Sequence, residues 1–327
     1  MELFDSLKFK IVRRGIRIAF PEASDTRILG AVARLKGEDL IEPVLIGKQH
    51  EIEQAAATRG INIANMTIYD PDNCGRWDQI VEAFVERRKG KVTKEQAEVL
   101  LKDENYFGTM LTYMGITDGL VSGAIHSTGD TVRPALQIIK TKPGISRTSG
   151  AFLMMRGNEQ EKYIFSDCAI NVAPSPQELA EIAVASAKTA KMFDIEPRVA
   201  MLSFSTKGSA KAPQAEATIE ATRLAKELAP DLAIDGELQF DAAYNQSVAA
   251  LKAPESDVAG KASVFVFPDL QSGNIGYKIA QRFGNFEAIG PILQGLNKPV
   301  SDLSRGCNEE DVYKLSIITA AQSLMNE

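Results

Sequence analysis

The stretch GLVSGAIHSTGDTVRPALQII (residues 119–139) contains the local pattern on which the fold prediction depends. It opens with a four-residue, mainly apolar run, continues with a loop rich in Gly, Ser and Thr, and ends with apolar residues at helical spacing over 131–139. A short apolar run next to turn residues predicts a buried strand, and the later spacing predicts a helix. The stretch therefore predicts a strand, a polar loop and a helix in that order.

The same order recurs along the chain. Strands are predicted at residues 17–20, 44–46, 67–69, 119–122, 152–155, 163–166, 199–204, 232–234 and 263–267. Helices are predicted among them at residues 26–35, 77–88, 94–101, 131–139, 176–192, 216–228 and 275–282. This alternation is typical of an α/β protein with largely parallel sheets. In such sheets, ligands usually bind in the loops that follow the carboxyl ends of the strands.

Two domains are expected, because 327 residues exceed what one hydrophobic core usually supports. The segment TKPG (residues 141–144) breaks the preceding helical pattern, and LNKP (residues 296–299) provides a second break. We expect the chain to cross between the domains at these two segments.

Three loops combine small hydroxyl residues and glycine with a basic group near a predicted helix start, at residues 122–134, 203–211 and 268–278. Free backbone N–H groups and the helix dipole favour negative charge at such positions. Serine and glycine also populate ordinary turns, so one such loop would carry little weight. The presence of three favours an anionic ligand.

Composition excludes several classes of protein. Hydrophobic residues make up 44% and charged residues 24% of the chain, as in an ordinary globular protein. The net charge of -6 argues against a nucleic-acid partner. No apolar run approaches the roughly 18 residues of a membrane helix, and the first residues lack a signal-peptide pattern. The 3 cysteines are too few and too scattered for a disulfide framework or a zinc site. We expect a cytoplasmic protein without a metal site or membrane partner.

Familiar nucleotide-binding fingerprints are missing. No Gly-x-Gly-x-x-Gly follows the first strand, and no Gly-x4-Gly-Lys-Ser/Thr occurs, so a standard Rossmann dehydrogenase or P-loop NTPase is not expected. The chain has 2 histidines, and His50 is expected at an exposed helix start. His126 is better placed, but one histidine makes a weak case for a metal. Catalysis is therefore expected to depend on Arg, Ser and Asp.

The stretch DLSRGCNEED (residues 302–311) gathers a hydroxyl, a guanidinium, a thiol and carboxylates before a helix. Arg305 can hold a phosphate or an oxyanion, Ser304 can donate or accept a hydrogen bond, and Asp311 can accept a proton. A purely structural interpretation is equally concrete. Asn308 can cap a helix, and Asp311 occupies the position at which a capping box places an acid.

Ordered matches along nearly the whole chain resemble the phosphate acetyl/butyryltransferase family, and phosphate acetyltransferases in particular. The matching segments are DENYFGTM (103–110), SGA (122–124), DTVRPALQIIK (130–140), AMLS (200–203), STKGSAK (205–211), DGELQ (235–239), GNI (273–275) and NKPVSDLSRGC (297–307). The resemblance implies the reversible conversion of acetyl-CoA and phosphate into CoA and acetyl phosphate. It also implies a homodimer and an isocitrate/isopropylmalate dehydrogenase-like fold with a cleft between two α/β domains. The first domain would comprise residues 1–143 and 297–327, and the second residues 144–296.

The resemblance also implies roles for particular residues. The family's catalytic Ser-Arg pair falls on Ser304 and Arg305, and its proposed base falls on Asp311. CoA would attack as a thiolate in a ternary complex, without a covalent enzyme intermediate. Because a carboxylate near a helix N-terminus is stabilised, Asp311 could instead orient a group while arginines lower the thiol pKa. Both interpretations of Asp311 remain open at this stage.

Phosphate is expected to bind a group of arginines and hydroxyls. Arg133 matches one family arginine, and the pair Arg87 and Arg88 contains another, with Arg88 favoured. Ser127 and Thr131, in the first of the three loops, complete the expected phosphate site.

CoA or acetyl-CoA, a substrate rather than a tightly bound cofactor, is expected to contact Arg27, Ser304, Cys307 and Asn274. Cys307 is next to Arg305 in the sequence of the turn, where a nearby cation can lower a thiol pKa. A nucleophilic role is nevertheless not expected, because CoA already supplies the thiol.

Three alternatives remain. The chain could prefer longer acyl groups such as butyryl, since one methylene changes binding by only about 1–3 kcal/mol. A dehydrogenase of the related fold would need a cluster of aspartates for a metal, and no clear one is visible. A non-catalytic protein that binds acyl-CoA or phosphate is a third possibility, although the complete Ser304, Arg305 and Asp311 set and the lack of a fused domain argue against it.

Overall fold

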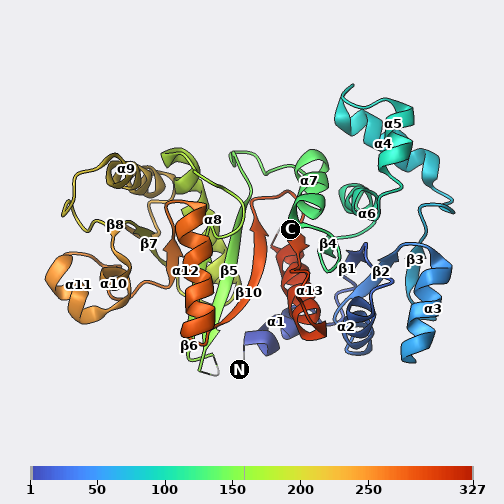
Figure 1. Cartoon of the computed structure of the whole chain (residues 1–327), viewed down its shortest axis with the longest axis horizontal. Helices are drawn as coiled ribbons and strands as arrows, with labels where there is room; N and C mark the ends of the chain where they lie inside the picture. Colours follow the sequence, from blue (N-terminus) through green and yellow to red (C-terminus); the bar gives the residue numbers. More distant parts are fainter. Residues whose placement is uncertain (1–2, 158, 326–327) are drawn as a thin grey trace. The chain divides into compact units, whose positions relative to one another are not determined.

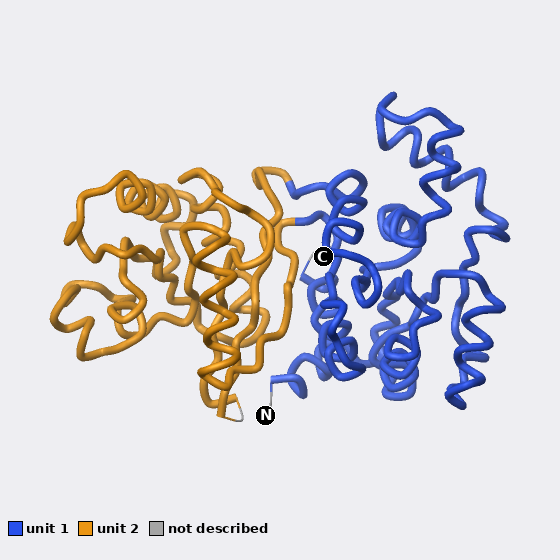
Figure 2. The backbone as a smooth tube through the Cα atoms, in the orientation of Figure 1, with its two compact units in different colours: residues 1–142, 296–327 blue, residues 143–295 orange. Residues whose placement is uncertain are grey.

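The computed structural model describes residues 3–157 and 159–325, which form two compact units. The first unit comprises residues 1–142 and 296–327, and the second comprises residues 143–295 (Figure 2). The chain leaves the first unit after residue 142 and returns to it at residue 296.

The first unit contains parallel strands in the order β3–β2–β1–β4–β11. The strands are β1 (Arg17–Phe20), β2 (Glu42–Ile46), β3 (Thr67–Tyr69), β4 (Gly119–Ser122) and β11 (Val300–Asp302). Its helices are α1 (Leu3–Ile11), α2 (Thr26–Gly37), α3 (Gln49–Arg59), α4 (Trp77–Arg88), α5 (Lys94–Leu100), α6 (Glu104–Tyr113), α7 (Thr128–Ile138) and α13 (Glu309–Leu324). Figure 1 shows α2 and α13 below these strands and α6 and α7 above them.

Strand pairing within the first unit places the candidate loops together. β4 pairs with β1 on one side and with β11 on the other, and all three strands run parallel. All four residues of β4 are buried, as expected for a strand covered on both faces. Because parallel neighbours end at the same edge, the loops after β1, β4 and β11 lie next to one another.

The second unit has strands in the order β10–β5–β6–β9–β7–β8. β5 is antiparallel to both β6 and β10, whereas the remaining pairs are parallel. The strands are β5 (Ser149–Arg156), β6 (Glu161–Ser166), β7 (Arg198–Leu202), β8 (Ala233–Leu238), β9 (Val264–Val266) and β10 (Glu287–Gln294). The helices are α8 (Pro176–Met192), α9 (Pro213–Leu228), α10 (Phe240–Tyr244), α11 (Gln246–Lys252) and α12 (Leu270–Phe283).

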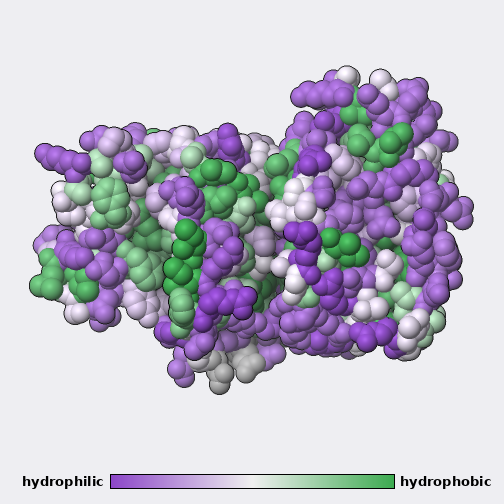
Figure 3. Space-filling model, viewed as in Figure 1, coloured by the Kyte–Doolittle hydropathy of each residue, from purple (hydrophilic) through white to green (hydrophobic). Residues whose placement is uncertain are grey.

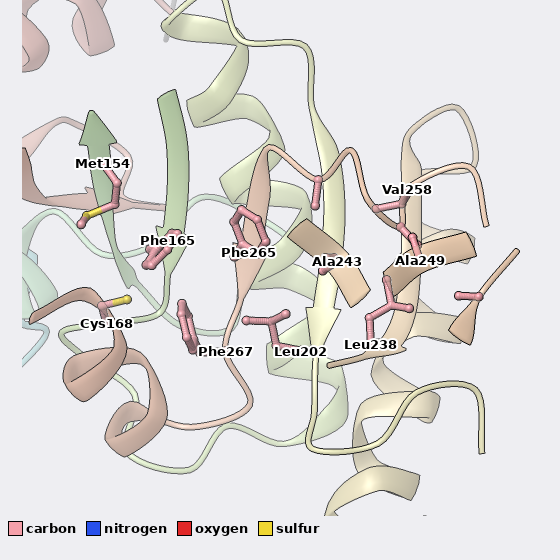
Figure 4. Packing of buried hydrophobic residues seen from close by; sticks show 14 of the residues in the cluster. Met154, Phe165, Cys168, Leu202, Leu238, Ala243, Ala249, Val258, Phe265 and Phe267 are labelled. Carbon is pink, nitrogen blue, oxygen red and sulfur yellow. The ribbon is translucent and has the colours of Figure 1, made fainter. Parts of the chain in front are cut away.

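Aromatic packing fills one core of the second unit (Figure 4). The ring centroids of Phe165 and Phe265 are 5.4 Å apart in an edge-to-face arrangement, and those of Phe240 and Phe265 are 5.1 Å apart. Such pairs contribute about 0.5–1.5 kcal/mol each beyond the burial of their surface.

The prediction of an α/β protein with largely parallel sheets is confirmed, but β10 and β11 were not predicted, and only β1, β3 and β4 have the predicted bounds. β10 was not predicted because Gly290 and Pro291 interrupt its apolar pattern. Gly290 has φ +152, and the pairing of β10 with β5 shifts register between Ile289 and Ile292, which is typical of a bulge. The strand predicted at residues 199–204 ends at Leu202, and Phe204 is exposed. No helix in the described part of the chain is long and apolar enough to cross a membrane.

Candidate functional site

A tight turn at residues 304–307 joins β11 to α13 and presents two of the expected catalytic side chains. The N–H of Cys307 donates to the carbonyl of Ser304 at 2.8 Å, which closes the turn. The N–H of Gly306 donates to Ser304 Oγ at 3.2 Å. Ser304 and Arg305 are both exposed, and the Arg305 guanidinium has no hydrogen-bond or ion-pair partner among the described residues. The turn therefore leaves Arg305 free to bind an anion.

Arg27, expected to bind CoA, holds this turn from the first turn of α2. Its Nη1 donates to the carbonyls of Arg305 and Cys307, both at 3.0 Å, and lies 3.7 Å from Cys307 Sγ. Its Nη2 donates to the carbonyl of Ala124 at 2.9 Å and to Asp25 Oδ2 at 2.8 Å, while Nε donates to Asp25 Oδ1 at 3.0 Å. A guanidinium has five N–H groups, so these contacts leave none for CoA.

The carboxylate of Glu22 binds the backbone N–H groups of the loop after β4. Its carboxylate, 1% exposed, accepts from the backbone N–H groups of residues 123–126 at 2.7–3.0 Å. It also lies 2.7 Å from His126 Nδ1. The loop does bind an anion, as its sequence indicates, but that anion is a carboxylate of the chain itself. These N–H groups are consequently not available to phosphate.

A second acidic side chain, Glu104, begins α6 close to His126. Burial raises the pKa of Glu104 to about 7, although the charge of His126 acts in the opposite direction. Glu22, His126 and Glu104 thus form a partly buried cluster at the carboxyl edge of the sheet. Among the described residues, no three His, Cys, Asp or Glu side chains are arranged to hold a metal ion.

The first turn of α7 contains the two hydroxyl residues expected at the phosphate site. Ser127 caps the helix, and its Oγ donates to Asp130 Oδ2 at 2.7 Å. Thr131 is 1% exposed, and its hydroxyl lies beside the carboxylate of Asp302. Asp302, at the end of β11, lies beside Thr128 and Thr131 and is also 1% exposed. Burial raises the pKa of Asp302 to about 6, while the two nearby hydroxyls act in the opposite direction.

Arg133 and Arg88 approach the same tyrosine from α7 and α4. Burial raises the pKa of Tyr106, whereas the positive charges of Arg133 and Arg88 act in the opposite direction. Tyr106 Oη donates to Gln137 Oε1 at 3.1 Å, on the same residue whose carbonyl Arg88 contacts. The Arg133 side chain is 61% exposed and its Nη2 lies 4.0 Å from Asp130 Oδ1. Arg88 Nη1 donates to the carbonyl of Gln137 at 3.3 Å, and its buried Nε has no partner in the described chain.

Arg87 faces a different environment from its neighbour. Its Nε and Nη2 donate to the carbonyls of Ile138 and Ile139 at 2.6 and 3.2 Å, at the end of α7. Its guanidinium carbon lies 4.7 Å from the ring centroid of Tyr113. Arg87 therefore caps the carboxyl end of α7, and the assignment of Arg88 as the substrate-facing arginine stays a prediction.

Asp311 forms the capping box that its sequence position indicates. Asp311 Oδ2 accepts from the N–H of Asn308, and Asn308 Oδ1 accepts from the N–H of Asp311, both at 2.9 Å. The side chain of Asp311 is exposed, and its Oδ1 has no hydrogen-bond partner among the described residues. Asp311 therefore starts α13 and still presents one oxygen to solvent.

Cys307 is 7% exposed and does not have the lowered pKa that a nearby arginine suggested. Burial raises the pKa of its thiol to about 11, although Arg27 acts in the opposite direction. A neutral, buried thiol is a poor nucleophile.

The remaining expected CoA residue, Asn274, belongs to the second unit. Its Nδ2 donates to the carbonyl of Cys168 at 3.1 Å, and its Oδ1 accepts from Lys278 Nζ at 2.8 Å. The other two anion-binding loops also contain internal acids. Glu237 Oε1 accepts from the N–H of Gly208 at 2.8 Å, and Asp269 Oδ1 accepts from the N–H of Ser272 at 2.8 Å.

Sequence reasoning missed Glu22, Asp302, Tyr106 and Glu104. Tyr106 and Glu104 lie within the matched segment of residues 103–110, and Asp302 lies in the matched segment of residues 297–307. Glu22 lies two residues after the first strand, a position typical of ligand-binding residues in parallel sheets. Their positions in the matched segments and after a strand were the sequence features by which these residues could have been found.

Comparison with known proteins adds to this geometry. The model of a family described as "Phosphate acetyl/butaryl transferase" matches residues 3–320. A phosphate acetyltransferase of Bacillus subtilis (strain 168) is 61% identical over 323 residues, covering 99% of each chain. A crystal structure of a phosphotransacetylase from Streptococcus pyogenes is 62% identical, covers 99% of this chain and 98% of that chain, and has a TM-score of 0.97.

A more distant structure is similar in fold alone. It comes from Salmonella typhimurium, is provisionally named a 4-hydroxythreonine-4-phosphate dehydrogenase, and is 13% identical with a TM-score of 0.51, covering 94% of this chain and 99% of that chain. This likeness agrees with the dehydrogenase-like fold that the sequence resemblance implied.

Proposed function

The chain belongs to the phosphate acetyl/butaryl transferase family, and we propose that it converts acetyl-CoA and phosphate reversibly into CoA and acetyl phosphate. The observation that carries this proposal is the turn at residues 304–307, which presents an unpaired arginine beside a serine at the carboxyl edge of a parallel sheet. The high identity to phosphate acetyltransferases over nearly the full chain supports the same reaction.

The proposed chemistry is a direct transfer in a ternary complex. In the direction of acetyl-CoA synthesis, Asp311 Oδ1 accepts the thiol proton of CoA, and the sulfur attacks the acetyl carbonyl. The C–S bond forms first and gives a tetrahedral intermediate with a negatively charged oxygen. When the carbonyl re-forms, the C–O bond to phosphate breaks and phosphate leaves with the bonding electron pair. A free thiol with a pKa of about 8.5 is only a few per cent ionised at neutral pH, so a proton acceptor assists the reaction.

Ser304 and Arg305 serve the thiol and the carbonyl in this scheme. Ser304 Oγ orients the sulfur by a hydrogen bond, and Arg305 stabilises the oxygen of the tetrahedral intermediate. Its unpaired guanidinium is suited to that task, because no internal bond has to break before the charge develops. Removal of one such donor typically costs about 2.7–4 kcal/mol in the barrier.

The phosphate group is proposed to bind between α4 and α7. Arg133 and Arg88 supply the positive charge, and both oppose the rise in the pKa of Tyr106 that burial causes. Ser127 and Thr131, in the first turn of α7, supply hydroxyls. Arg87 is assigned no phosphate contact, because its guanidinium binds the carbonyls at the end of α7.

CoA is proposed to contact the turn at residues 304–307 through Ser304 and Cys307. The reaction needs no tightly bound cofactor, because the two substrates supply the thiol, the acyl group and the leaving group. The two compact units are proposed to be the two domains of the family.

The experiment that tests the proposed function is CoA-dependent release of phosphate from acetyl phosphate. We expect acetyl-CoA and phosphate to form in equal amounts, with potassium present and no added metal. A parallel reaction with butyryl phosphate tests the longer-chain alternative, for which the butyryl rate would exceed the acetyl rate. A chain that binds CoA but releases no phosphate would instead be a non-catalytic binding protein.

The family resemblance also implies a homodimer, and we propose that α12 forms part of its interface. Ile275, Ile279 and Phe283 recur every four residues along α12 and are 57%, 52% and 87% exposed. This spacing places them on one helix face, and Figure 3 shows apolar residues along α12. An exposed apolar stripe marks an interaction surface, and a second copy of the chain is the occupant that the family implies.

Light scattering tests this interface. The wild-type chain is expected to have the mass of a dimer, and Phe283→Glu that of a monomer. Phe9→Glu is the matched control, because Phe9 is 78% exposed on α1 without such a stripe. A dimeric Phe283→Glu variant would contradict the assignment.

The cytoplasm is the proposed location, because a reducing compartment keeps CoA and the 3 free cysteines as thiols. Cell fractionation with an antibody against the chain would test it.

A further inference from the structure

Arg27 makes contacts with three separate segments of the first unit. It follows the carboxyl end of β1, reaches the loop after β4 through the Ala124 carbonyl, and reaches the turn after β11 through the carbonyls of Arg305 and Cys307. These are the three loops that parallel pairing brings to one edge of the sheet. A single side chain therefore connects the elements that carry the proposed site.

Asp25 fixes the orientation of the Arg27 guanidinium. Its two oxygens accept from Arg27 Nε and Nη2 at 3.0 and 2.8 Å, and Oδ1 also caps α2 by accepting from the Arg27 N–H at 2.8 Å. Burial alone would raise the pKa of Asp25, but the hydrogen bonds from Arg27 lower it. The bidentate pair leaves the remaining N–H groups aimed at the backbone carbonyls.

The loop after β4, which Arg27 contacts at Ala124, is fixed by several further hydrogen bonds. Glu22 binds the N–H groups of residues 123–126, while Arg27 binds the carbonyl of Ala124 within the same segment. The turn at residues 304–307 has fewer internal bonds and is exposed at its tip. Arg27 thus joins the less constrained turn to the more constrained loop.

We propose that Arg27 is a positioning residue that fixes the turn at residues 304–307, and that it acts on CoA only through that turn. This inference rests on the proposed function. A direct CoA ligand would need a free guanidinium N–H, whereas each N–H of Arg27 has an acceptor within the chain. Displacement of a catalytic group by about 1 Å can lower a rate by about 10²-fold, so the position of Ser304 and Arg305 matters for turnover.

Steady-state kinetics separates positioning from binding. Arg27→Lys keeps the positive charge but lacks the planar set of donors, and Arg27→Ala lacks both. We expect both variants to lower kcat at least about tenfold, with KM for CoA changed less than about threefold. Asp25→Asn, which keeps a capping oxygen, should lower kcat in the same direction. A large rise in KM for CoA, with kcat preserved and with Lys restoring binding, would show a direct ligand instead.

The matched control is Arg17, at the opposite end of β1. Arg17 also binds one aspartate through two nitrogens, Nε at 3.3 Å and Nη2 at 3.0 Å from the carboxylate of Asp118, and its Nη2 donates to the carbonyl of Gly115 at 3.0 Å. Arg17→Lys and Arg17→Ala remove the same kind of network away from the turn. We expect kcat within about twofold of wild type for both, as for surface ion pairs of small energetic weight.

The reactivity of Cys307 provides a readout that does not depend on activity. In a Cys74→Ser background, the remaining thiols are Cys307, which is 7% exposed, and Cys168, which is fully buried. Loss of Arg27 should open the turn, so that an aromatic disulfide reagent modifies Cys307 at least about tenfold faster than in the Arg17→Ala control. The loss of positive charge alone would slow this reaction, because Arg27 lowers the pKa of the Cys307 thiol.

Phosphate release tests the proposed function, whereas the rate of Cys307 modification tests the positioning role of Arg27. A wild-type chain without phosphate release would overturn the proposed function, and the Cys307 rates would still test the positioning role. Equal modification rates for the Arg27 and Arg17 variants, with both folded by circular dichroism, would overturn the positioning role.

Discussion

Glu22→Gln should weaken the loop after β4 by a predictable amount. Glu22 Oε2 accepts from the N–H groups of Gly123 and Ala124, and Oε1 accepts from those of Ile125 and His126. Glutamine keeps one acceptor oxygen and replaces the other with an NH₂ donor. In either amide orientation, two backbone N–H groups therefore lose their acceptor and face a donor.

The expected loss of local stability follows from the two backbone N–H groups that lose their acceptor. Each buried N–H left without a partner costs about 1–3 kcal/mol, so two cost about 2–6 kcal/mol. The lower half of this range applies if the part-buried N–H groups of Ile125 and His126 are the ones released, because water can reach them. A loss of 2 kcal/mol corresponds to an increase of about thirtyfold in the local opening equilibrium.

Hydrogen exchange measured by mass spectrometry is the appropriate assay, because a chain of two units need not unfold in one step. Amides 123–126 should exchange at least about thirtyfold faster in Glu22→Gln than in wild type. Glu310→Gln is the control, since Glu310 forms an exposed ion pair with Arg34 and should change little. Wild-type exchange at amides 123–126 in Glu22→Gln would refute the assigned role of the carboxylate.

Three further substitutions test other parts of the site. Burial raises the pKa of Glu104 from 4.5 to about 7, so the wild-type chain should lose stability relative to Glu104→Gln as pH rises through this window, with a constant difference above it. Urea midpoints at pH 5 and pH 8 check this sign, and equal differences at both would contradict it. Asp311→Asn keeps an oxygen for the cap but cannot take a proton, so kcat should fall at least about tenfold with unchanged stability. An unshifted pH–rate profile at a near-normal rate would remove the base role. Cys307→Ala should keep kcat within about threefold, and a loss of about 10³-fold would restore a nucleophilic role.

The strands could be predicted wherever a buried run carried uninterrupted apolar residues. β1, β3 and β4 have the predicted bounds. β4 is buried at all four residues, and a parallel strand covered on both faces contains few polar residues. β10 could not be predicted in this way, since Gly290 and Pro291 interrupt it and a bulge absorbs them. Turn residues within a strand carry the same sequence signal as a loop.

The candidate site shows a second limit of prediction from the sequence. The sequence of residues 122–134 predicted an anion-binding loop, and the loop binds Glu22, which is about 100 residues away in the chain. Local sequence reports the free N–H groups but not which anion occupies them. The choice between Arg87 and Arg88 was open for a related reason, because consecutive helical residues point in directions about 100° apart. Only the packing of α4 against α7 shows that Arg87 caps the helix.

The central claim is that Arg305, on the turn after β11, stabilises the oxygen that becomes charged during acetyl transfer. The most direct measurement compares kcat for acetyl-CoA formation in wild type, Arg305→Ala and Arg17→Ala, with folding checked by circular dichroism. We expect Arg305→Ala to lower kcat by about 10²–10³-fold and Arg17→Ala to leave it nearly unchanged. Near-normal turnover by a folded Arg305→Ala variant would contradict the account.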